Sequence, residues 1–309
     1  MSCSRSISDK EIKALTVGVG AVACGVATAG DVECDVSADL QRWVSNGCHA
    51  DMRWLVRHVE LRRNTSSVLP GCRSVIVCAF SYKPPVERDR SLPRFALYAY
   101  GEDYHDVVRR RLKLITDELT HRYGGIHRIC VDTAPVSERY WAIRSGIGHQ
   151  GRNCLLSVPH YGSYVVLGEI LTTLDITPSA PCMGKCPDNC RLCVDACPGH
   201  ALSGDGHLDS RRCLSYLTIE HRGPLPPGIK LNGQVFGCDI CQRVCPMNRN
   251  AVASEIPEFA ASPQMLTLSA EDILAMDNDG FRQLFGHSAV RRTGLEGLQR
   301  NIIANINKF

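Results

Sequence analysis

The sequence has little net charge, no long charged tract and no apolar stretch suited to a membrane. Its 309 residues carry 35 Lys and Arg against 32 Asp and Glu, a net charge of +3. This excludes a polycationic arm or an acidic tail, so any surface that binds a polyanion must be local. The uncharged run at residues 15–30 consists mainly of Gly, Ala, Val and Thr, with a single Leu. Such a run is too weakly apolar for a membrane span or a secretion signal. We expect a cytoplasmic chain.

Internal repeats and low-complexity tracts are also lacking, while hydrophobic residues make up 44% and charged residues 22% of the chain. This composition is ordinary for a globular protein and excludes collagen-like, disordered and coiled-coil classes. Cysteine is the exception, with seventeen residues. The chain is too long for a disulfide-stapled miniprotein, and the number is odd. Either the protein is oxidised outside the cell, or its thiolates bind metal inside it.

The pattern of elements predicts three domains. Residues 1–177 alternate strands, such as 74–82, with helices, such as 103–123, which predicts an α/β (α+β) domain. Residues 178–250 contain nine of the seventeen cysteines and many Gly and Pro. That segment cannot easily build its own core, so we expect its bound metal to hold it together. Residues 251–309 predict a short helical tail, in which Ser269 caps a helix through Asp272.

The cysteine spacing in the middle domain predicts two iron–sulfur clusters. One run ends in Cys-x3-Cys-Pro at residues 193–198, and the other in Cys-x3-Cys-Pro at 241–246. In ferredoxin-like runs, the Cys before Pro ligates the other cluster. This predicts one cluster on Cys186, Cys190, Cys193 and Cys245, and a second on Cys197, Cys213, Cys238 and Cys241. Cys182, four residues before Cys186, is an alternative first ligand. A pair of structural zinc sites is the alternative to the clusters, although the repeated Cys-Pro ending argues against zinc.

The chain resembles the epoxyqueuosine reductase family. The resemblance rests on segments spread over nearly the whole sequence, including LPGCRSVIVCAFSY (69–82), YGEDYHDVVRRRL (100–112), VDTAPVSERYWAIRSGIGHQGRN (131–153) and GCDICQRVCPMN (237–248). It implies an α/β domain that binds base-off cobalamin, followed by a ferredoxin-like domain with two [4Fe-4S] clusters. The implied oxidoreductase reaction reduces epoxyqueuosine to queuosine at the wobble position of tRNA. Such chemistry leaves the difficult step to the cofactor, while the protein supplies orientation, electrons and protons.

The resemblance also implies roles for individual residues. Asp132 matches the proton donor of the family, and it follows a predicted strand, although an aspartate there could equally cap a turn. Near cobalamin we expect a raised pKa for this carboxyl. Arg57 is predicted to face cobalamin, as is Asp132. Further predicted cofactor contacts, on the seam between cobalamin and the clusters, are Ser215, Asp239 and Gln242. One departure is His149, which stands where the family usually has an aromatic residue; we expect it, like His105, to be structural.

The implied partners are the anticodon loop of a tRNA and an external low-potential electron donor. We expect a monomer with no membrane contact. Paired arginines such as Arg291 and Arg292 are candidate phosphate contacts, against the alternative of solvated surface charges. Two other functions remain open at this point: a cobalamin-dependent reductase of another small substrate, and a two-cluster electron-transfer protein.

Overall fold

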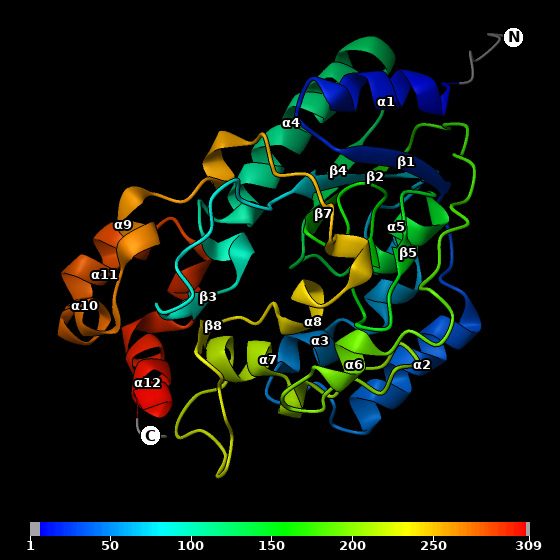
Figure 1. Ribbon diagram of the computed structural model, residues 1–309. Helices are drawn as coiled ribbons and strands as arrows, with labels where there is room; N and C mark the ends of the chain where they lie inside the picture. The colour runs from blue at the N-terminus through cyan, green and yellow to red at the C-terminus, as the bar shows by residue number, and fades with distance from the viewer. Residues whose placement is uncertain (1–6, 307–309) are drawn as a thin grey trace, which may run out of the picture.

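The computed structural model describes residues 7–306, and a four-stranded sheet lies at its centre (Figure 1). The strands are β1 (Ala23–Thr28), β2 (Ser74–Ser81), β4 (His127–Cys130) and β7 (Val165–Thr172), in the order β1-β2-β7-β4. All three pairings are antiparallel. The mixture of helix and sheet agrees with the predicted class, and the antiparallel pairing makes the domain α+β. The order departs from the chain order because β7 inserts between β2 and β4.

Helices cover both faces of this sheet. Alternate residues of β2 point to opposite sides: Ile76 and Phe80 belong to one buried cluster, whereas Val77 belongs to another. The first cluster lies under α1 (Asp9–Val17) and α4 (Tyr104–Tyr123), and the second under α5 (Glu138–Arg144). This alternation follows from the two-residue period of a strand. Helix α4 approaches β7 closely because Gly168 has no side chain: a Cβ there would lie 2.5 Å from Val108.

Local signals for helix ends are mostly confirmed. Ser269 and Asp272 form the expected capping box at the start of α10 (Ala270–Ala275). Helix α3 (Arg53–Arg57) is short and begins after Met52. Asp51 accepts a hydrogen bond from Tyr216 instead of capping that helix. Helix α2 (Cys34–Ser45) precedes it.

The cysteine-rich segment has short elements joined by loops. These are α6 (Leu192–Asp195), α7 (Leu214–Ile219), β8 (Gln234–Phe236) and α8 (Ile240–Arg243). Strand β8 pairs in parallel with β3 (Arg94–Phe95) of the first segment. The small hairpin of β5 (His149–Gln150) and β6 (Leu156–Ser157) lies near α5 (Figure 1). The segment is therefore joined to the α+β part by backbone pairing as well as by side chains.

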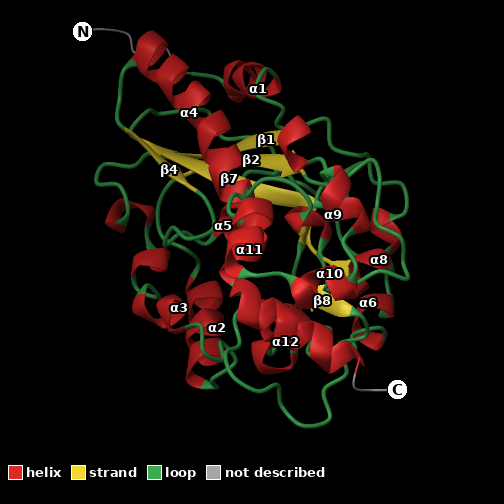
Figure 2. Cartoon of the chain, turned by 90° about the vertical axis from the view of Figure 1, so that its left-hand side faces the viewer, coloured by secondary structure: helices red, strands yellow, loops and turns green. Residues whose placement is uncertain are grey.

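The C-terminal segment is helical, as expected. It contains α9 (Pro263–Thr267), α10, α11 (Asn278–Phe285) and α12 (Gly294–Ile306). Helices α9, α10 and α11 form a group at the left of Figure 1, and α12 contacts both α10 and β8 (Figures 1 and 2). Asn301 of α12 is fully buried and donates hydrogen bonds to the carbonyl oxygens of Thr218 and Val235. The largest buried cluster contains residues from all three segments, among them Ile76, Phe236 and Ile302. No helix within residues 7–306 is long and apolar enough to cross a membrane.

Candidate active site and cysteine centres

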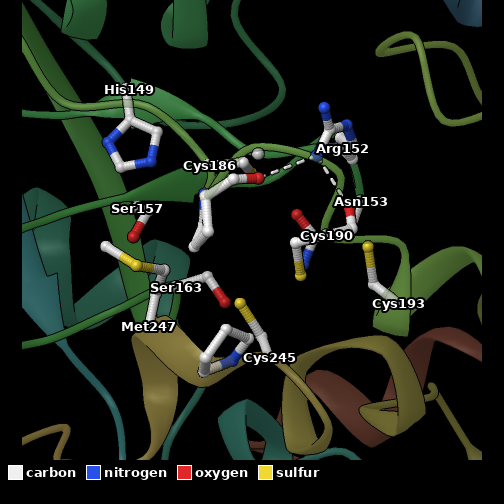
Figure 3. A pocket seen from close by; sticks show the side chains of 13 residues that line it. His149, Arg152, Asn153, Ser157, Ser163, Cys186, Cys190, Cys193, Cys245 and Met247 are labelled. Atoms are coloured by element: carbon white, nitrogen blue, oxygen red, sulfur yellow. Dashed lines mark hydrogen bonds between the residues drawn. The ribbon is translucent and has the colours of Figure 1, made fainter.

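Four cysteines line one cavity (Figure 3). Cys186, Cys190 and Cys193 come from the first run, and Cys245 comes from the end of the second. Pro246 closes the cavity beside Cys245. The structure thus brings together the four thiols that the spacing assigned to one cluster, including the one contributed from a distant part of the chain.

Three polar side chains on the same cavity have buried atoms without a hydrogen-bond partner among residues 7–306. They are Nε2 of His149, Nδ2 of Asn153 and Oγ of Ser157. Burial lowers the pKa of His149, so its ring is neutral near pH 7 and one ring nitrogen carries a proton to donate. A buried donor without a partner costs about 1–3 kcal/mol. An anionic, sulfur-rich group in this cavity would accept hydrogen bonds from these atoms, so the donors fit an iron–sulfur cluster.

The other four predicted ligands form a second group. Cys197 and Cys241 pack against one small buried cluster, and Cys213 and Cys238 pack against another. The charges of Cys197 and Cys213 both act to raise the pKa of Cys238 and of Cys241. Burial is the main cause that raises the pKa of Cys238 to about 12 and the pKa of Cys241 far above its usual value, and the neighbouring thiols add to it. These thiols therefore stay protonated unless a metal takes the place of the proton. Iron is a partner that would do so.

Short helices connect the two cysteine groups. Helix α6 carries Cys193 of the first group and ends just before Cys197 of the second. Helix α8 carries Cys241 of the second group and ends just before Cys245 of the first. A turn of helix thus lies between the two cysteines of each pair, which the spacing assigns to different clusters. Cys182 is not among the described residues that line the first cavity. Its Sγ accepts a hydrogen bond from the backbone N–H of Gly184 at 3.4 Å.

Asp132 lies in a separate network of charged side chains. It follows β4 with a left-handed backbone, φ +46°, which is strained for a residue other than glycine. Its side chain is 53% exposed, and its Oδ2 lies 3.0 Å from Nε2 of His105. Nδ1 of His105 lies 2.6 Å from Oδ1 of Asp103, and Oδ2 of Asp103 accepts a hydrogen bond from Arg291 at 3.0 Å. The network therefore joins the loop after β4, the start of α4 and the C-terminal segment.

The pKa shifts place the proton of this network on histidine. Burial acts to raise the pKa of Asp132, but the hydrogen bond and the charge of His105 outweigh it, and the pKa is lowered. Burial acts to lower the pKa of His105, but Asp103 and Asp132 together raise it to about 9. The expectation of a raised pKa for Asp132 is therefore wrong. The pKa of Asp132 is lowered by its contact with His105, 27 residues earlier in the chain. The position of Asp132 at the end of a predicted strand gives no information about this contact.

The four predicted cobalamin contacts other than Asp132 lie in different settings. Arg57 is exposed at the end of α3, and Ser215 is partly buried on α7, two residues after Cys213. Oδ2 of Asp239 accepts the N–H of Leu97 at 2.8 Å. Gln242 donates from Nε2 to the Tyr82 hydroxyl at 2.9 Å and to a backbone carbonyl oxygen at 2.8 Å. The structure brings Asp239 and Gln242 together at α8, where both attach the cysteine-rich segment to the α+β part.

The candidate phosphate contacts Arg291 and Arg292 are ion-paired with protein groups. Arg291 contacts Asp103, and Arg292 contacts both oxygens of Glu220 while its guanidinium lies 4.9 Å from the centre of the Trp54 ring. Both side chains are about half exposed and ion-paired within the protein. Their role as phosphate contacts stays a prediction.

Sequence reasoning missed the groups behind Asp132. Glu138 accepts the backbone N–H of Asp132 at 2.5 Å, and Arg62 donates to the carbonyl oxygens of Ala134 and Val136. Glu169 is completely buried on β7. The signal for Glu169 was present, because it is the one charged residue in the strand VVLGEILT. Glu138 and Arg62 carried no such signal.

Comparison with known proteins identifies the family. Residues 62–133 match the family "Epoxyqueuosine reductase QueG, DUF1730", and residues 185–248 match "4Fe-4S double cluster binding domain". The epoxyqueuosine reductase of Cellulophaga algicola is 33% identical over 294 residues, 94% of this chain and 95% of the relative. A crystal structure of epoxyqueuosine reductase with an epoxyqueuosine-modified tRNA-Tyr stem loop matches with a TM-score of 0.86 and 30% identity, covering 96% of this chain and 80% of the other.

The Bacillus subtilis enzyme gives a similar match. Its structure, with a catalytic aspartate loop swung out of the active site, has a TM-score of 0.84 and 30% identity, and covers 96% of this chain and 80% of that one. Sequence identity above 30% over nearly the full length, together with the same fold, leaves one conclusion. The chain belongs to the epoxyqueuosine reductase family.

Proposed function

We propose that this chain reduces epoxyqueuosine to queuosine at the wobble position of a tRNA, with electrons from two [4Fe-4S] clusters passing to cobalamin. The observation that carries the proposal is a fold that matches, over 96% of the chain, an epoxyqueuosine reductase bound to a modified tRNA stem loop. The reaction consumes two electrons and two protons and releases water. An external low-potential donor supplies the electrons, and the chain acts as a monomer in the cytoplasm. The proposed domains are residues 1–177 for cobalamin, 178–250 for the clusters and 251–309 as a tail.

The cysteines are proposed to hold the clusters in an exchanged pattern. Cys186, Cys190, Cys193 and Cys245 bind one cluster, and their shared cavity supports this assignment. Cys197, Cys213, Cys238 and Cys241 bind the other. Clusters held this way transfer single electrons. Because α6 and α8 each carry a ligand of one group and end two residues before a ligand of the other, the protein holds the two clusters at a fixed separation.

Cobalamin, when bound, supplies a cobalt centre that passes electrons to the substrate. The edge of cobalamin carries amide groups, so side chains that contact it should be exposed and able to form hydrogen bonds. The exposed guanidinium of Arg57, the partly buried hydroxyl of Ser215 and the half-exposed carboxyl of Asp132 meet that requirement. Asp239 and Gln242 are already hydrogen-bonded within the protein. We therefore propose that these two act toward the cofactor by fixing α8 against the α+β domain.

Asp132 and His105 are proposed to act together as the acid. The imidazole holds the proton near neutrality because two carboxylates flank it. Asp132, with its half-exposed side chain, contacts the departing oxygen and passes on the proton that His105 holds. A general acid must lie within hydrogen-bonding reach of the group it protonates. The catalytic aspartate loop of the Bacillus subtilis relative supports an acid on such a loop.

The decisive experiment measures queuosine in tRNA. A strain lacking its own epoxyqueuosine reductase is complemented with this chain, and its tRNA nucleosides are quantified. Restored queuosine supports the proposal. Accumulated epoxyqueuosine, with cobalamin bound to the purified and reconstituted protein, would favour a reductase of another small substrate. Accumulated epoxyqueuosine with two clusters and no cobalamin would favour an electron-transfer protein.

A further inference from the structure

Two carboxyl groups, one fully buried and one partly buried, lie behind the loop that carries Asp132. This Asp132 loop (residues 131–137) connects β4 to α5, and Glu138 is the first residue of α5. Glu169 lies in the middle of β7 with a fully buried side chain. Neither oxygen of Glu169 has a hydrogen-bond donor among residues 7–306. The carboxyl within hydrogen-bonding reach of Glu169 is that of Glu138.

Two adjacent carboxylates cannot both be charged in a buried site, because their repulsion and desolvation are too costly. One proton shared between them removes both problems and gives Glu169 the partner it otherwise lacks. Glu138 has other groups that favour its charged form: the backbone N–H of Asp132 at 2.5 Å and the nearby guanidinium of Arg62. Glu169 therefore keeps the proton, and its O–H donates a hydrogen bond to Glu138, which carries the negative charge.

The Asp132 loop depends on hydrogen bonds from residues outside it. Asp132 has a left-handed backbone, which costs energy in a residue with a side chain. Two groups secure the loop: Arg62 binds the carbonyl oxygens of Ala134 and Val136, and Glu138 binds the N–H of Asp132 itself. A hydrogen bond to a charged acceptor is about twice as strong as one to a neutral acceptor. The charge on Glu138 thus acts directly at the strained residue.

We propose that Glu138, hydrogen-bonded by the protonated Glu169, is a positioning residue that keeps the Asp132 loop in place beside His105. The inference deepens the proposed function, because it assumes that Asp132 is the acid. Protonation of Glu138 weakens its bond to the Asp132 N–H and releases the loop. The carboxyl pair of Glu138 and Glu169 thereby makes the position of Asp132 dependent on pH.

The groups around Glu138 set the pH at which it is protonated and the Asp132 loop is released. Asp132 faces it from the loop, Arg62 from the 3-10 turn Leu61–Arg63, and Glu169 from β7. Three weaker neighbours of the carboxyl pair are Cys130 of β4, Tyr104 of α4 and Cys78 of β2. Burial, followed by the charge of Asp132, raises the pKa of Glu138 to about 7. The charged form that holds the loop is therefore present above pH 7 and is lost below it.

The test uses amide hydrogen exchange of the full-length, cluster-loaded protein at pH 8 and pH 6, corrected for intrinsic exchange rates. In Glu138→Gln we expect exchange within residues 131–137 to be about tenfold faster than in wild type at pH 8, the size of a charge-assisted bond replaced by a neutral one. At pH 6 the two proteins should converge. Glu169→Gln should stay close to wild type, because an amide also donates to Glu138. Glu60→Gln, at an exposed glutamate of the same domain, is the matched control.

Two results would overturn the proposal. One is equal exchange of the loop in wild type and Glu138→Gln at pH 8. The other is a Glu169→Gln protein with a loop as loose as that of Glu138→Gln, since the charge would then not reside on Glu138. Wild type alone gives a further check if Glu138→Gln does not fold: its loop should loosen between pH 8 and pH 6. These readouts do not depend on tRNA, so a protein that fails to make queuosine but shows the pattern refutes the proposed function alone.

Discussion

The cysteine centres and the proposed proton-transfer network of this protein are built in opposite ways. The cysteines of the first cavity lie three to four residues apart, apart from Cys245, and short helices direct them. The proton network joins Asp103, Asp132 and Arg291, which come from α4, the loop after β4 and the C-terminal segment. Local spacing thus specifies the proposed path of electrons, whereas packing of distant elements creates the proposed path of protons. Variants in the two regions should consequently fail in different ways.

The largest effect is expected from loss of a cluster ligand. Cys245→Ser should lower the iron content of the reconstituted protein from about eight to about four per chain and abolish turnover, since one [4Fe-4S] cluster is lost. Cys182→Ser is the matched control and should keep both clusters. Iron analysis and the visible spectrum measure the outcome. Loss of iron in Cys182→Ser with normal iron in Cys186→Ser would move the first ligand to Cys182.

The next largest effect is expected from a change in the proton-transfer network that leaves the cysteine centres intact. Asp132→Asn should keep both clusters and tRNA binding but slow single-turnover reduction of epoxyqueuosine-tRNA by about 10²-fold or more, because an amide cannot donate the proton. An Asn variant that is fully loaded with cofactors and as fast as wild type would remove Asp132 from the mechanism. A variant with lower stability and normal activity per folded molecule would make the residue a structural cap.

His105 should show its role through pH. Its pKa is raised from 6.5 to about 9, so the imidazole carries a proton below pH 9 and the single-turnover rate should fall above that pH. His105→Gln should be about tenfold slower near neutrality and should lack this alkaline limb. The raised pKa also stabilises the fold: the contribution is complete below pH 6.5 and is lost as the pH rises to about 9. Thermal unfolding of wild type and variant across this range should therefore converge at the alkaline end.

The smallest effect concerns the environment of one cluster. His149→Phe removes a buried donor from the cavity of Cys186, Cys190, Cys193 and Cys245. Hydrogen bonds to cluster sulfurs raise the reduction potential, so one of the two clusters should become harder to reduce while the other is unchanged. Redox titration followed by electron paramagnetic resonance distinguishes them. A shift in both clusters, or in neither, would contradict donation from His149.

Much of the fold followed from local patterns. The buried run of β2, the apolar face of α4 and the capping box at Ser269 are all consequences of periods of two or about 3.6 residues, or of a single side chain reaching a nearby backbone N–H. The order of strands and their antiparallel pairing did not follow from such patterns. They depend on which apolar faces meet, and this involves residues far apart in the chain.

For the site, the sequence by itself was enough to predict the two sets of cysteines, because a cluster constrains its ligands through short spacing and a following proline. It also indicated Asp132 through its resemblance to a known family. Only the tertiary structure decided where the proton resides, because His105 meets Asp132 and Asp103 at the junction of α4 and the loop after β4. It likewise decided that Glu138 and Glu169 face each other behind that loop. Charges act across space, so their pKa values depend on neighbours that no short sequence pattern can specify.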